Sequence, residues 1–249
     1  MIAHRGASGH APENTLAAFE LAVHQGADAF ELDVRLTADG VPVVLHDATL
    51  QRTTGSRLSA ASQTLAQLRQ ADAGARFSPD AGRNFPFRGA GLLIPTLAEV
   101  LEFFPDMPIL LDIKEARAQA AVRQLLLEKR AAERCVVASE EMAALALFDA
   151  RRFSRAASPR EISWLYWGSL LRRASRTAPS QAIECPYQAL SVPLRYRGLT
   201  IPTPSFVAAA RGRGCPVHVW TVNDPAIAQG LWRAGVAGIV TNFPGRMRS

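Results

Sequence analysis

Short apolar runs with the character of β-strands alternate with amphipathic runs of helical spacing along almost the whole sequence. The strand-like runs lie at residues 2–4, 28–36, 109–113, 135–138, 154–157, 190–192, 217–221 and 238–241. Helical runs fall between most of them, at residues 13–25, 97–104, 116–132, 140–150, 159–173, 204–213 and 225–234. Eight strands with intervening helices in a chain of 249 residues are typical of an α/β fold of the (β/α)8 TIM-barrel type.

An open doubly wound sheet is the alternative fold for the same alternation. The dinucleotide-binding fingerprint that such sheets often carry is missing, because the glycine pairs at 89/91 and 212/214 lack the third glycine. Residues 53–94 break the alternation with a Ser-, Gly- and Pro-rich composition and one short helical run at 64–69. We therefore expect a single domain over residues 1–249, a barrel with a small insertion after the second strand, at about residues 53–94, that covers one end as a lid.

The formal net charge of +6 is the difference between an acidic first part and a basic last part. Residues 1–50 contain seven acids and two arginines, whereas residues 151–249 contain fourteen arginines and three acids. The basic part has no zinc-finger or aromatic RNA-binding motif, so we expect no nucleic-acid partner. The sequence also shows no apolar run of membrane-spanning length, no leader at its start and no paired cysteines, which together favour a cytoplasmic protein.

The strand-like run at residues 28–36 carries two carboxylates on one face. Glu31 and Asp33 alternate with apolar residues, and side chains two apart on a strand point the same way. Exposure to solvent would explain two such acids on an isolated strand. In a barrel, helices cover one face and side chains fill the other, so inward carboxylates need a partner.

A hairpin offers one partner, because Asp39-Gly40 between two apolar runs is a strong turn signal. If these two residues form the loop, His46 lies opposite Asp33, with Cβ atoms roughly 5 Å apart. A shift by one residue would turn His46 away. We expect the two-residue loop, and with it His46 beside the acids.

A third acid, two cationic residues and a second histidine complete the candidate site. Asp112 ends a later strand, at the rim where barrel active sites gather, and Lys114 shares its face. Carboxylates of this kind suit a divalent cation such as Mg²⁺ or Ca²⁺. His4 and Arg5 end the first strand at the same rim, where an imidazole that titrates near neutral pH and a phosphate-binding guanidinium are useful. We interpret the histidines at 10, 24 and 218 as structural or exposed.

These residues belong to an ordered series of motifs with which the sequence resembles glycerophosphodiester phosphodiesterases of the bacterial, cytosolic kind. The series covers nearly the whole chain: His4-Arg5-Gly6, Pro12-Glu13-Asn14-Thr15, Glu31-Leu-Asp33, Asp39-Gly40, His46-Asp47 with Arg52-Thr-Thr, Pro95-Thr96-Leu97, Asp112-Ile-Lys114, Trp220-Thr-Val-Asn223 and Gly238-Ile-Val-Thr-Asn-Phe-Pro244. Each motif is weak alone, whereas their ordered co-occurrence is specific.

The resemblance implies a barrel that hydrolyses glycerophosphodiesters to glycerol 3-phosphate and an alcohol. It implies one divalent metal held by Glu31, Asp33 and Asp112, although the family commonly has Glu at the third position, one methylene longer than Asp112. His4 and His46 fall where the family has its acid/base pair.

The same resemblance implies supporting roles for five further residues. Arg5 and Lys114 would neutralise the phosphodiester beside the metal. Glu13 and Asn14 would brace the metal acids or His4. Trp220, at the same rim, is a candidate wall of the glycerol pocket, and packing in the core is an equal alternative for this aromatic.

Two other functions remain open at this stage. Residues 164–176 combine three aromatics with three arginines, the composition of a segment at a membrane surface, although a barrel helix that buries its aromatics is the stronger expectation. If this segment faces the lid, we expect the enzyme to prefer lysophospholipids over water-soluble glycerophosphodiesters, as a lysophospholipase D does. The second alternative is a noncatalytic phosphate-binding protein, which paired imidazoles disfavour because binding alone does not need them. The oligomeric state is not indicated by the sequence.

Overall fold

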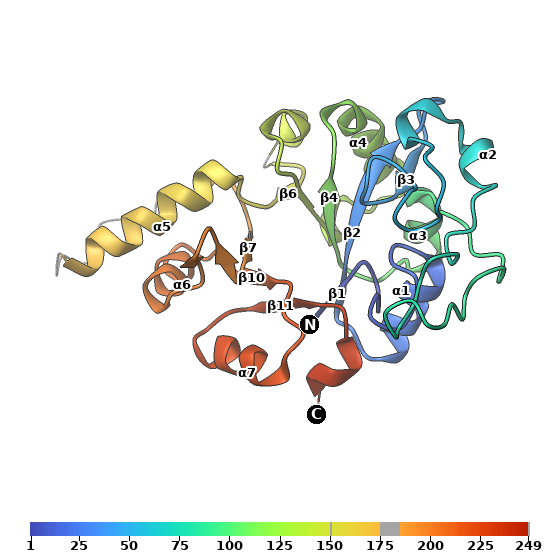
Figure 1. The fold of residues 1–249 in the computed structure, drawn as a ribbon. Coiled ribbons are helices and arrows are strands. Elements are labelled where there is room, and N and C mark those ends of the chain that lie inside the picture. The colour runs from blue at the N-terminus through green and yellow to red at the C-terminus, as the bar shows by residue number, and fades with distance from the viewer. Residues whose placement is uncertain (150, 175–184, 249) are drawn as a thin grey trace.

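Parallel strands of one curled sheet form the centre of the molecule (Figure 1). A computed structural model describes residues 1–149, 151–174 and 185–248. The sheet runs in the order β6-β5-β4-β2-β1-β11-β10-β7. A parallel bridge between Ala156 and Ala189 joins its two edges. The strands are β1 (Ile2–His4), β2 (Ala29–Leu36), β4 (Ile109–Ile113), β5 (Cys135–Ala138), β6 (Ser154–Arg155), β7 (Leu190–Pro193), β10 (Val217–Trp220) and β11 (Gly238–Thr241). The predicted TIM barrel is therefore confirmed.

Helices lie outside the sheet, and several of them begin directly after a residue whose side chain caps the first turn. Thr15 accepts from the backbone of α1, and Thr96 forms a reciprocal capping box with Glu99 in α3. Thr203 and Asp224 cap α6 and α7, each followed by proline in the first turn. The bounds are α1 (Leu16–His24), α2 (Leu65–Leu68), α3 (Leu97–Phe103), α4 (Gln119–Glu128), α5 (Pro159–Ala174), α6 (Pro204–Arg211) and α7 (Pro225–Arg233). No helix in the described ranges is long and apolar enough to cross a membrane.

The helix expected at residues 140–150 is wrong, because the described residues there form only the short 3₁₀ turn η4 (Met142–Leu145). Phe148 turns inward to pack edge-on against Phe153, with ring centroids 5.2 Å apart, and this ends the helical run. The run at 116–132 is also divided, because 3₁₀ turns flank α4. The 3₁₀ turns are η1 (Ala60–Ser62), η2 (Ala116–Ala118), η3 (Ala132–Arg134), η4 and η5 (Pro244–Arg248).

Alternation along the strands separates an apolar outer layer from a polar interior. Phe30, Leu32 and Val34 of β2 are fully buried under the helices, with the Phe30 ring 4.8 Å from that of Phe19 in α1. Burial of each such side chain contributes about 1.5–3 kcal/mol. Glu31 and Asp33 consequently point into the barrel, as the spacing predicts.

The hairpin after β2 has a different loop from the one expected. Strand β3 (Pro42–Val44) pairs with β2 so that Val44 lies opposite Val34, and the Leu45 amide donates to the Asp33 carbonyl. The predicted pairing of His46 with Asp33 is therefore wrong by one residue. The cause is a three-residue loop, Ala38 to Gly40, with Gly40 at φ +79°, a conformation that glycine adopts without strain.

The segment between β3 and α3 packs as a satellite beside the barrel (Figure 1). It contains η1 and α2 and has its own apolar cluster, in which Leu50 and Leu68 are fully buried. None of residues 53–94 lines the large cavity of the barrel, and the lid expected from this segment stays a prediction. Its apolar residues pack against Val43 and Leu45, in and directly after β3.

A second hairpin, β8 (Arg195–Tyr196) with β9 (Leu199–Thr200), follows β7 and was not expected from the sequence. Its two-residue loop has Arg197 at φ 47° and Gly198 at φ 83°, the geometry of a type I′ turn. An Xaa-Gly pair between alternating residues was the signal available. This hairpin lies beside α5 at the edge of the barrel (Figure 1).

Candidate active site

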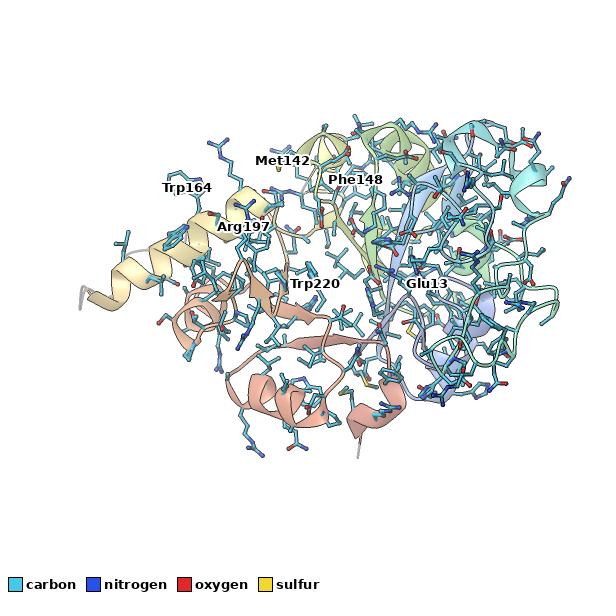
Figure 2. All side chains as sticks on the ribbon, viewed as in Figure 1. Glu13, Met142, Phe148, Trp164, Arg197 and Trp220 are labelled. Carbon is cyan, nitrogen blue, oxygen red and sulfur yellow. The ribbon has the colours of Figure 1, made fainter. Side chains whose placement is uncertain are left out.

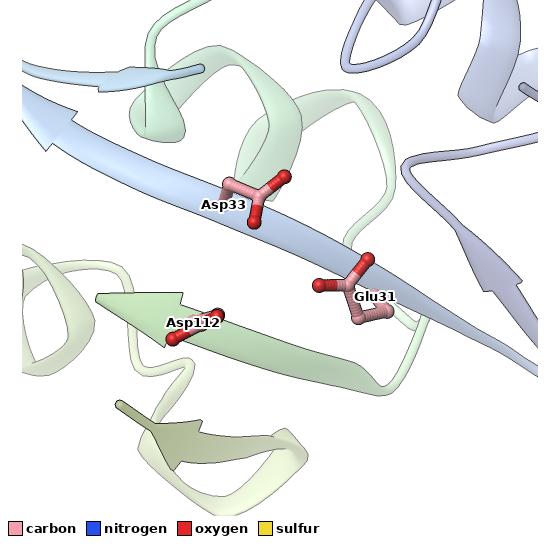
Figure 3. A group of neighbouring side chains, drawn as sticks. All are labelled: Glu31, Asp33 and Asp112. Atoms are coloured by element: carbon pink, nitrogen blue, oxygen red, sulfur yellow. The ribbon is translucent and has the colours of Figure 1, made fainter. Parts of the chain in front are cut away.

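Three carboxylates meet inside the barrel at the carboxyl ends of β2 and β4 (Figure 3). Asp33 and Asp112 are register partners on these neighbouring strands, and Glu31 precedes Asp33 by two residues on the same face. One carboxylate oxygen from each of the three lies within 4.8 Å of the others. The strand register alone is enough to bring the predicted metal acids together.

Two cationic side chains lie against these acids. The Lys114 ammonium is 2.7 Å from Asp33 Oδ1 and 2.5 Å from Asp112 Oδ2. Arg5 Nε is 3.0 Å from Asp33 Oδ2, and the Asn14 amide donates to the same oxygen at 2.9 Å. Asp33, which is fully buried, is therefore surrounded by donors.

Burial and these charges move the acids' pKa values apart. Burial, and then the charges of Asp33 and Asp112, raise the pKa of Glu31 well above its usual value. Burial also acts to raise the pKa of Asp33, but Lys114 and Arg5 outweigh it and hold this pKa below its usual value. Burial raises the pKa of Asp112 despite the neighbouring Lys114. A divalent cation would favour the ionised form of all three acids.

The donor set fits such a cation. Asp112 Oδ1 is buried, and no hydrogen-bond donor reaches it among the residues that the structure describes. A buried carboxylate oxygen without a donor is costly unless a cation or water meets it. Three carboxylate groups are hard oxygen ligands of the kind that Mg²⁺ and Ca²⁺ prefer.

His4 is held at the end of β1 with one ring nitrogen engaged. Its Nδ1 lies 2.6 Å from Asn242 Oδ1, and its Nε2 is 3.9 Å from Glu31 Oε2. Burial, and then the charge of Arg5, lower the pKa of His4. Asn242 positions the His4 ring and was not singled out from the sequence, although it stands in the last of the recognised motifs.

His46 is held in a similar way from the other side. Its Nδ1 lies 2.6 Å from Asp47 Oδ1, whose second oxygen accepts from Arg52 Nε at 2.7 Å. Arg52 also donates two bonds to Glu13, which in turn accepts from Arg5. Burial acts to raise the pKa of Asp47, but the Arg52 and His46 contacts outweigh it and lower this pKa to about 2. A continuous chain of charges therefore links the His46 ring to Arg5.

The backbone after β1 is shaped so that Arg5 can reach the acids. Arg5 and Gly6 have φ values of 57° and 81°, and Asn14 has φ 57°. A Cβ on Gly6 would lie 2.6 Å from the Ala18 carbonyl carbon in α1, so glycine is required for this close approach. Positive φ at Arg5 costs of order 1–3 kcal/mol, which the surrounding ion pairs offset.

The three carboxylates, the two cationic side chains and the two histidines open into one cavity of about 850 Å³. His4, Arg5, Glu31, Asp33 and His46 line its inner end, together with Asp112, Lys114 and Trp220. His46 reaches this cavity although its predicted strand partner was wrong, because β3 ends at Val44 and the chain bends at His46, whose carbonyl accepts from Arg35 Nε at 2.8 Å. Glu13 and Asn14 stand behind the lining.

The cavity also has lining residues that the sequence did not single out. Arg160 and Ile162 come from α5, and Tyr196, Arg197 and Leu199 come from the β8–β9 hairpin. On α5, Tyr166 is buried, as the sequence favoured for these aromatics, whereas Trp164 and Trp167 are 72% and 54% exposed. The basic end of this segment, residues 175 and 176, lies outside the described residues.

Comparisons with known proteins indicate the same family as the motifs of the sequence. The model of the glycerophosphoryl diester phosphodiesterase family matches residues 4–246. A glycerophosphodiester phosphodiesterase of Caldanaerobacter subterraneus subsp. tengcongensis is 32% identical over 255 residues, which cover 98% of this chain and 94% of the relative. The chain belongs to the glycerophosphoryl diester phosphodiesterase family, whose members are phosphodiester hydrolases.

Solved structures show the same fold. A glycerophosphodiester phosphodiesterase from Agrobacterium tumefaciens superimposes with a TM-score of 0.76 at 25% identity, covering 99% of this chain and 97% of the other. A phosphodiesterase from Oleispira antarctica, solved in complex with the product sn-glycerol-3-phosphate, superimposes with a TM-score of 0.76 at 27% identity, covering 99% and 94%.

Proposed function

We propose that the chain hydrolyses glycerophosphodiesters to glycerol 3-phosphate and an alcohol with the help of one divalent cation, Mg²⁺ or Ca²⁺. The observation that carries the proposal is the convergence of three carboxylates within 4.8 Å, two cationic side chains and two histidines at one end of a cavity. The product bound to the Oleispira antarctica relative supports the class of substrate.

Glu31, Asp33 and Asp112 would hold the cation. When bound, it supplies positive charge that neutralises the phosphodiester and stabilises the charge that develops on its oxygens. Arg5 and Lys114, which already lie within 3.0 Å of Asp33, add fixed positive charge for the non-bridging phosphate oxygens. Trp220 forms a wall against which the glycerol backbone lies.

His4 and His46 act as the acid/base pair. One imidazole takes a proton from the attacking hydroxyl group, and the other gives a proton to the departing alkoxide. Both rings have Nδ1 engaged by an oxygen, of Asn242 and Asp47 respectively, so that Nε2 is the nitrogen presented to substrate. Glu13 and Asn14 position this machinery through Arg5 and Asp33.

Release of glycerol 3-phosphate from glycerophosphocholine tests the proposal directly. We expect release by the purified full chain with Mg²⁺ or Ca²⁺, loss of release with a chelator and recovery when the cation is restored. Binding of glycerophosphodiesters without release under any of these conditions would instead favour the noncatalytic phosphate-binding alternative.

Four expectations about the location, domain organisation and partners of the protein stay predictions. These are a cytoplasmic location, the organisation of residues 1–249 as a single domain, the lack of a nucleic-acid partner and peripheral contact with a membrane. For the last of these, the exposed side chains of Trp164 and Trp167 on α5 are the supporting observation.

A further inference from the structure

Arg35, the third charged residue of β2, has no role in the proposed function. It follows Glu31 and Asp33 at the same spacing of two residues, so strand alternation places it on their face. Its side chain is 15% exposed, yet it is not part of the lining of the large cavity. A mostly buried charge needs partners within the protein. The role of Arg35 is therefore defined by the groups that it contacts.

The contacts of Arg35 hold the chain at His46. Its Nε donates to the His46 carbonyl at 2.8 Å, and its Nη1 is 3.8 Å from Glu115 Oε2. Glu115 directly follows Lys114 and is itself fixed, because its Oε1 accepts from the Leu36 amide at 2.8 Å. The guanidinium therefore joins the ends of β2 and β4 to the segment that carries His46.

The bond from Arg35 reaches the chain at a point where the hairpin ladder has ended. Strand β3 ends before His46, and the Leu45 amide makes the last bond from this segment to β2, at the Asp33 carbonyl. The chain then bends, and none of the backbone hydrogen bonds between described residues involves His46 or Asp47. Rotation of an unsupported peptide moves the side chain attached to it. The bond from Arg35 prevents this rotation.

The imidazole of His46 is thus held from two sides. On one side, Asp47 lies 2.6 Å from its Nδ1 and accepts from Arg52, which also bonds Glu13. Glu13 lies in the half of the barrel that contains β2, away from α5 (Figure 2). On the other side, Arg35 fixes the backbone from which the ring projects. Catalytic groups need such support, because their geometry must be kept within about 0.5 Å.

We propose that Arg35 is a positioning residue for the reaction, which sets the location of the His46 imidazole through the His46 carbonyl. This inference rests on the proposed function, in which His46 belongs to the acid/base pair. Among the described residues, the contacts of Arg35 include neither the metal acids nor the cavity. Loss of Arg35 therefore leaves substrate binding intact and slows proton transfer, since a misplacement of about 1 Å costs on the order of 10²-fold in rate.

Two variants of Arg35 differ in a single property, the ability of the atom at the ε position to donate. Arg35→Gln places an amide nitrogen where arginine has Nε, whereas Arg35→Met places a methyl group there. Both variants lack the charge. For the full chain with its cation and glycerophosphocholine, we expect Arg35→Met to lower kcat by about 10- to 100-fold and to change KM by less than about twofold. Arg35→Gln should recover most of this loss. Equal kcat values in the two variants would contradict the inference.

Arg117 is the matched control in the same cluster of charges. It is 3.1 Å from Glu115 Oε1 and donates to the Leu36 carbonyl, but none of its contacts among the described residues is to His46. Arg117→Met should keep kcat within about twofold of the wild type, whatever its effect on the melting temperature. An equal loss of kcat in Arg117→Met and Arg35→Met would show that the cluster has a structural role only.

A double variant tests whether Arg35 acts through His46. Once His46→Ala has removed the imidazole, its location no longer matters, so the further change Arg35→Met should alter kcat by less than about twofold. The same loss in the presence and in the absence of the imidazole would overturn the inference, because residues that act independently have multiplicative effects on the rate. Thermal unfolding of each variant shows that it is folded.

The outcomes keep the inference apart from the proposed function. No turnover by the wild type with its cation contradicts the proposed function. A wild-type rate in His46→Ala contradicts the catalytic role of His46. A large loss in His46→Ala, together with an unchanged kcat in Arg35→Met, overturns the inference alone and leaves the proposed function intact.

Discussion

The Lys114 ammonium lies 2.7 Å from Asp33 Oδ1, although the two residues come from neighbouring strands of the barrel. The same ammonium is 2.5 Å from Asp112, so that one cation joins two of the three candidate metal ligands. Lys114 therefore stabilises the acids while no metal is bound, and it stands where substrate phosphate needs positive charge.

Replacement of Lys114 by Met should destabilise the metal-free protein and increase its response to metal. Removing one partner from a buried ion pair costs about 3 kcal/mol, which lowers the melting temperature of a chain of this size by roughly 6–12 °C. Because Asp33 and Asp112 then lack the charge of Lys114, saturating Mg²⁺ or Ca²⁺ should raise the melting temperature more than in the wild type. Thermal unfolding with and without cation measures both effects.

Lys129 is the matched control, since it is the second of the two lysines in the chain. It pairs with Glu102 on the surface, where both side chains are at least 36% exposed. Such a pair contributes about 0–1 kcal/mol, so Lys129→Met should leave the response to metal unchanged. A Lys114 variant that behaves like the Lys129 variant would show that Lys114 does not interact with the cation site.

The metal acids could be predicted from the sequence because they depend on strand periodicity alone. Glu31 and Asp33 share a face by their spacing. Parallel pairing of their strand with the strand of Asp112 then places the third acid beside them. The register of His46 depended on the size of one turn, where Gly40 at positive φ allowed a three-residue loop. Alternation of residues cannot determine such a loop length.

The cavity lining that α5 and the β8–β9 hairpin contribute could not be predicted from the sequence, for a different reason. Tyr196 and Leu199 reach the cavity through a hairpin of two-residue strands, too short to leave a periodic pattern. Trp164 and Trp167 have the same chemistry and neighbouring positions, so only the packing of α5 in three dimensions decides which of them lines the cavity. Such packing depends on residues far away in the sequence.

His4 and His46 should each be essential for turnover. Replacement of either by Ala is expected to lower kcat by on the order of 10² to 10⁴, the usual contribution of one general acid or base. His24→Ala, at an exposed position on α1, should retain wild-type rates. Steady-state kinetics with glycerophosphocholine provides the measurement. Rates near the wild-type value in both site variants would remove the acid/base assignment.

Asp47 should influence kcat while leaving KM nearly unchanged, because it touches His46 and is not part of the cavity lining. Asp47→Asn keeps the shape but removes the charge that fixes the imidazole, and we expect a loss in kcat of about tenfold or more. Asp47→Glu should recover part of the rate. A parallel change of KM, or no recovery with Glu, would indicate a structural role for Asp47 only.

Asp112 should govern metal preference through its short side chain. Asp112→Asn is expected to lower kcat/KM by at least about 10², because it removes a charged ligand. Asp112→Glu keeps the charge and places the carboxylate one methylene further from the backbone, so activity should survive with a changed ratio of Mg²⁺ to Ca²⁺ activation. Glu128→Gln, on the exposed side of α4, is the control. An unchanged metal ratio in the Glu variant, or full activity in the Asn variant, would exclude Asp112 as a ligand.

His218 should make the stability of the fold depend on pH. Its ring fills the bottom of the barrel, where a Cβ on Gly238 would lie 2.7 Å from its Cδ2, and no hydrogen-bond partner reaches its Nδ1 among the described residues. Burial, and then the charge of the N-terminus, lower the pKa of His218 to about 4 from 6.5. The unfolded chain therefore binds a proton below pH 6.5 that the folded chain binds only below about pH 4.

The contribution of His218 to the free energy of unfolding is therefore fully present above pH 6.5. It falls by up to about 3 kcal/mol as the pH falls to about 4. His218→Met, which fills the same space without a titratable group, should remove this part of the pH dependence. Urea unfolding of the wild type and the variant is compared at pH 7 and pH 4.5, with chelator present to remove metal binding. The difference between the two proteins then reports on His218, because all other titrating groups are shared. The same experiment with His24→Gln should give wild-type behaviour, because that ring is exposed. A pH dependence that is identical in the wild type and the Met variant would mean that water reaches the His218 ring and keeps its proton affinity ordinary.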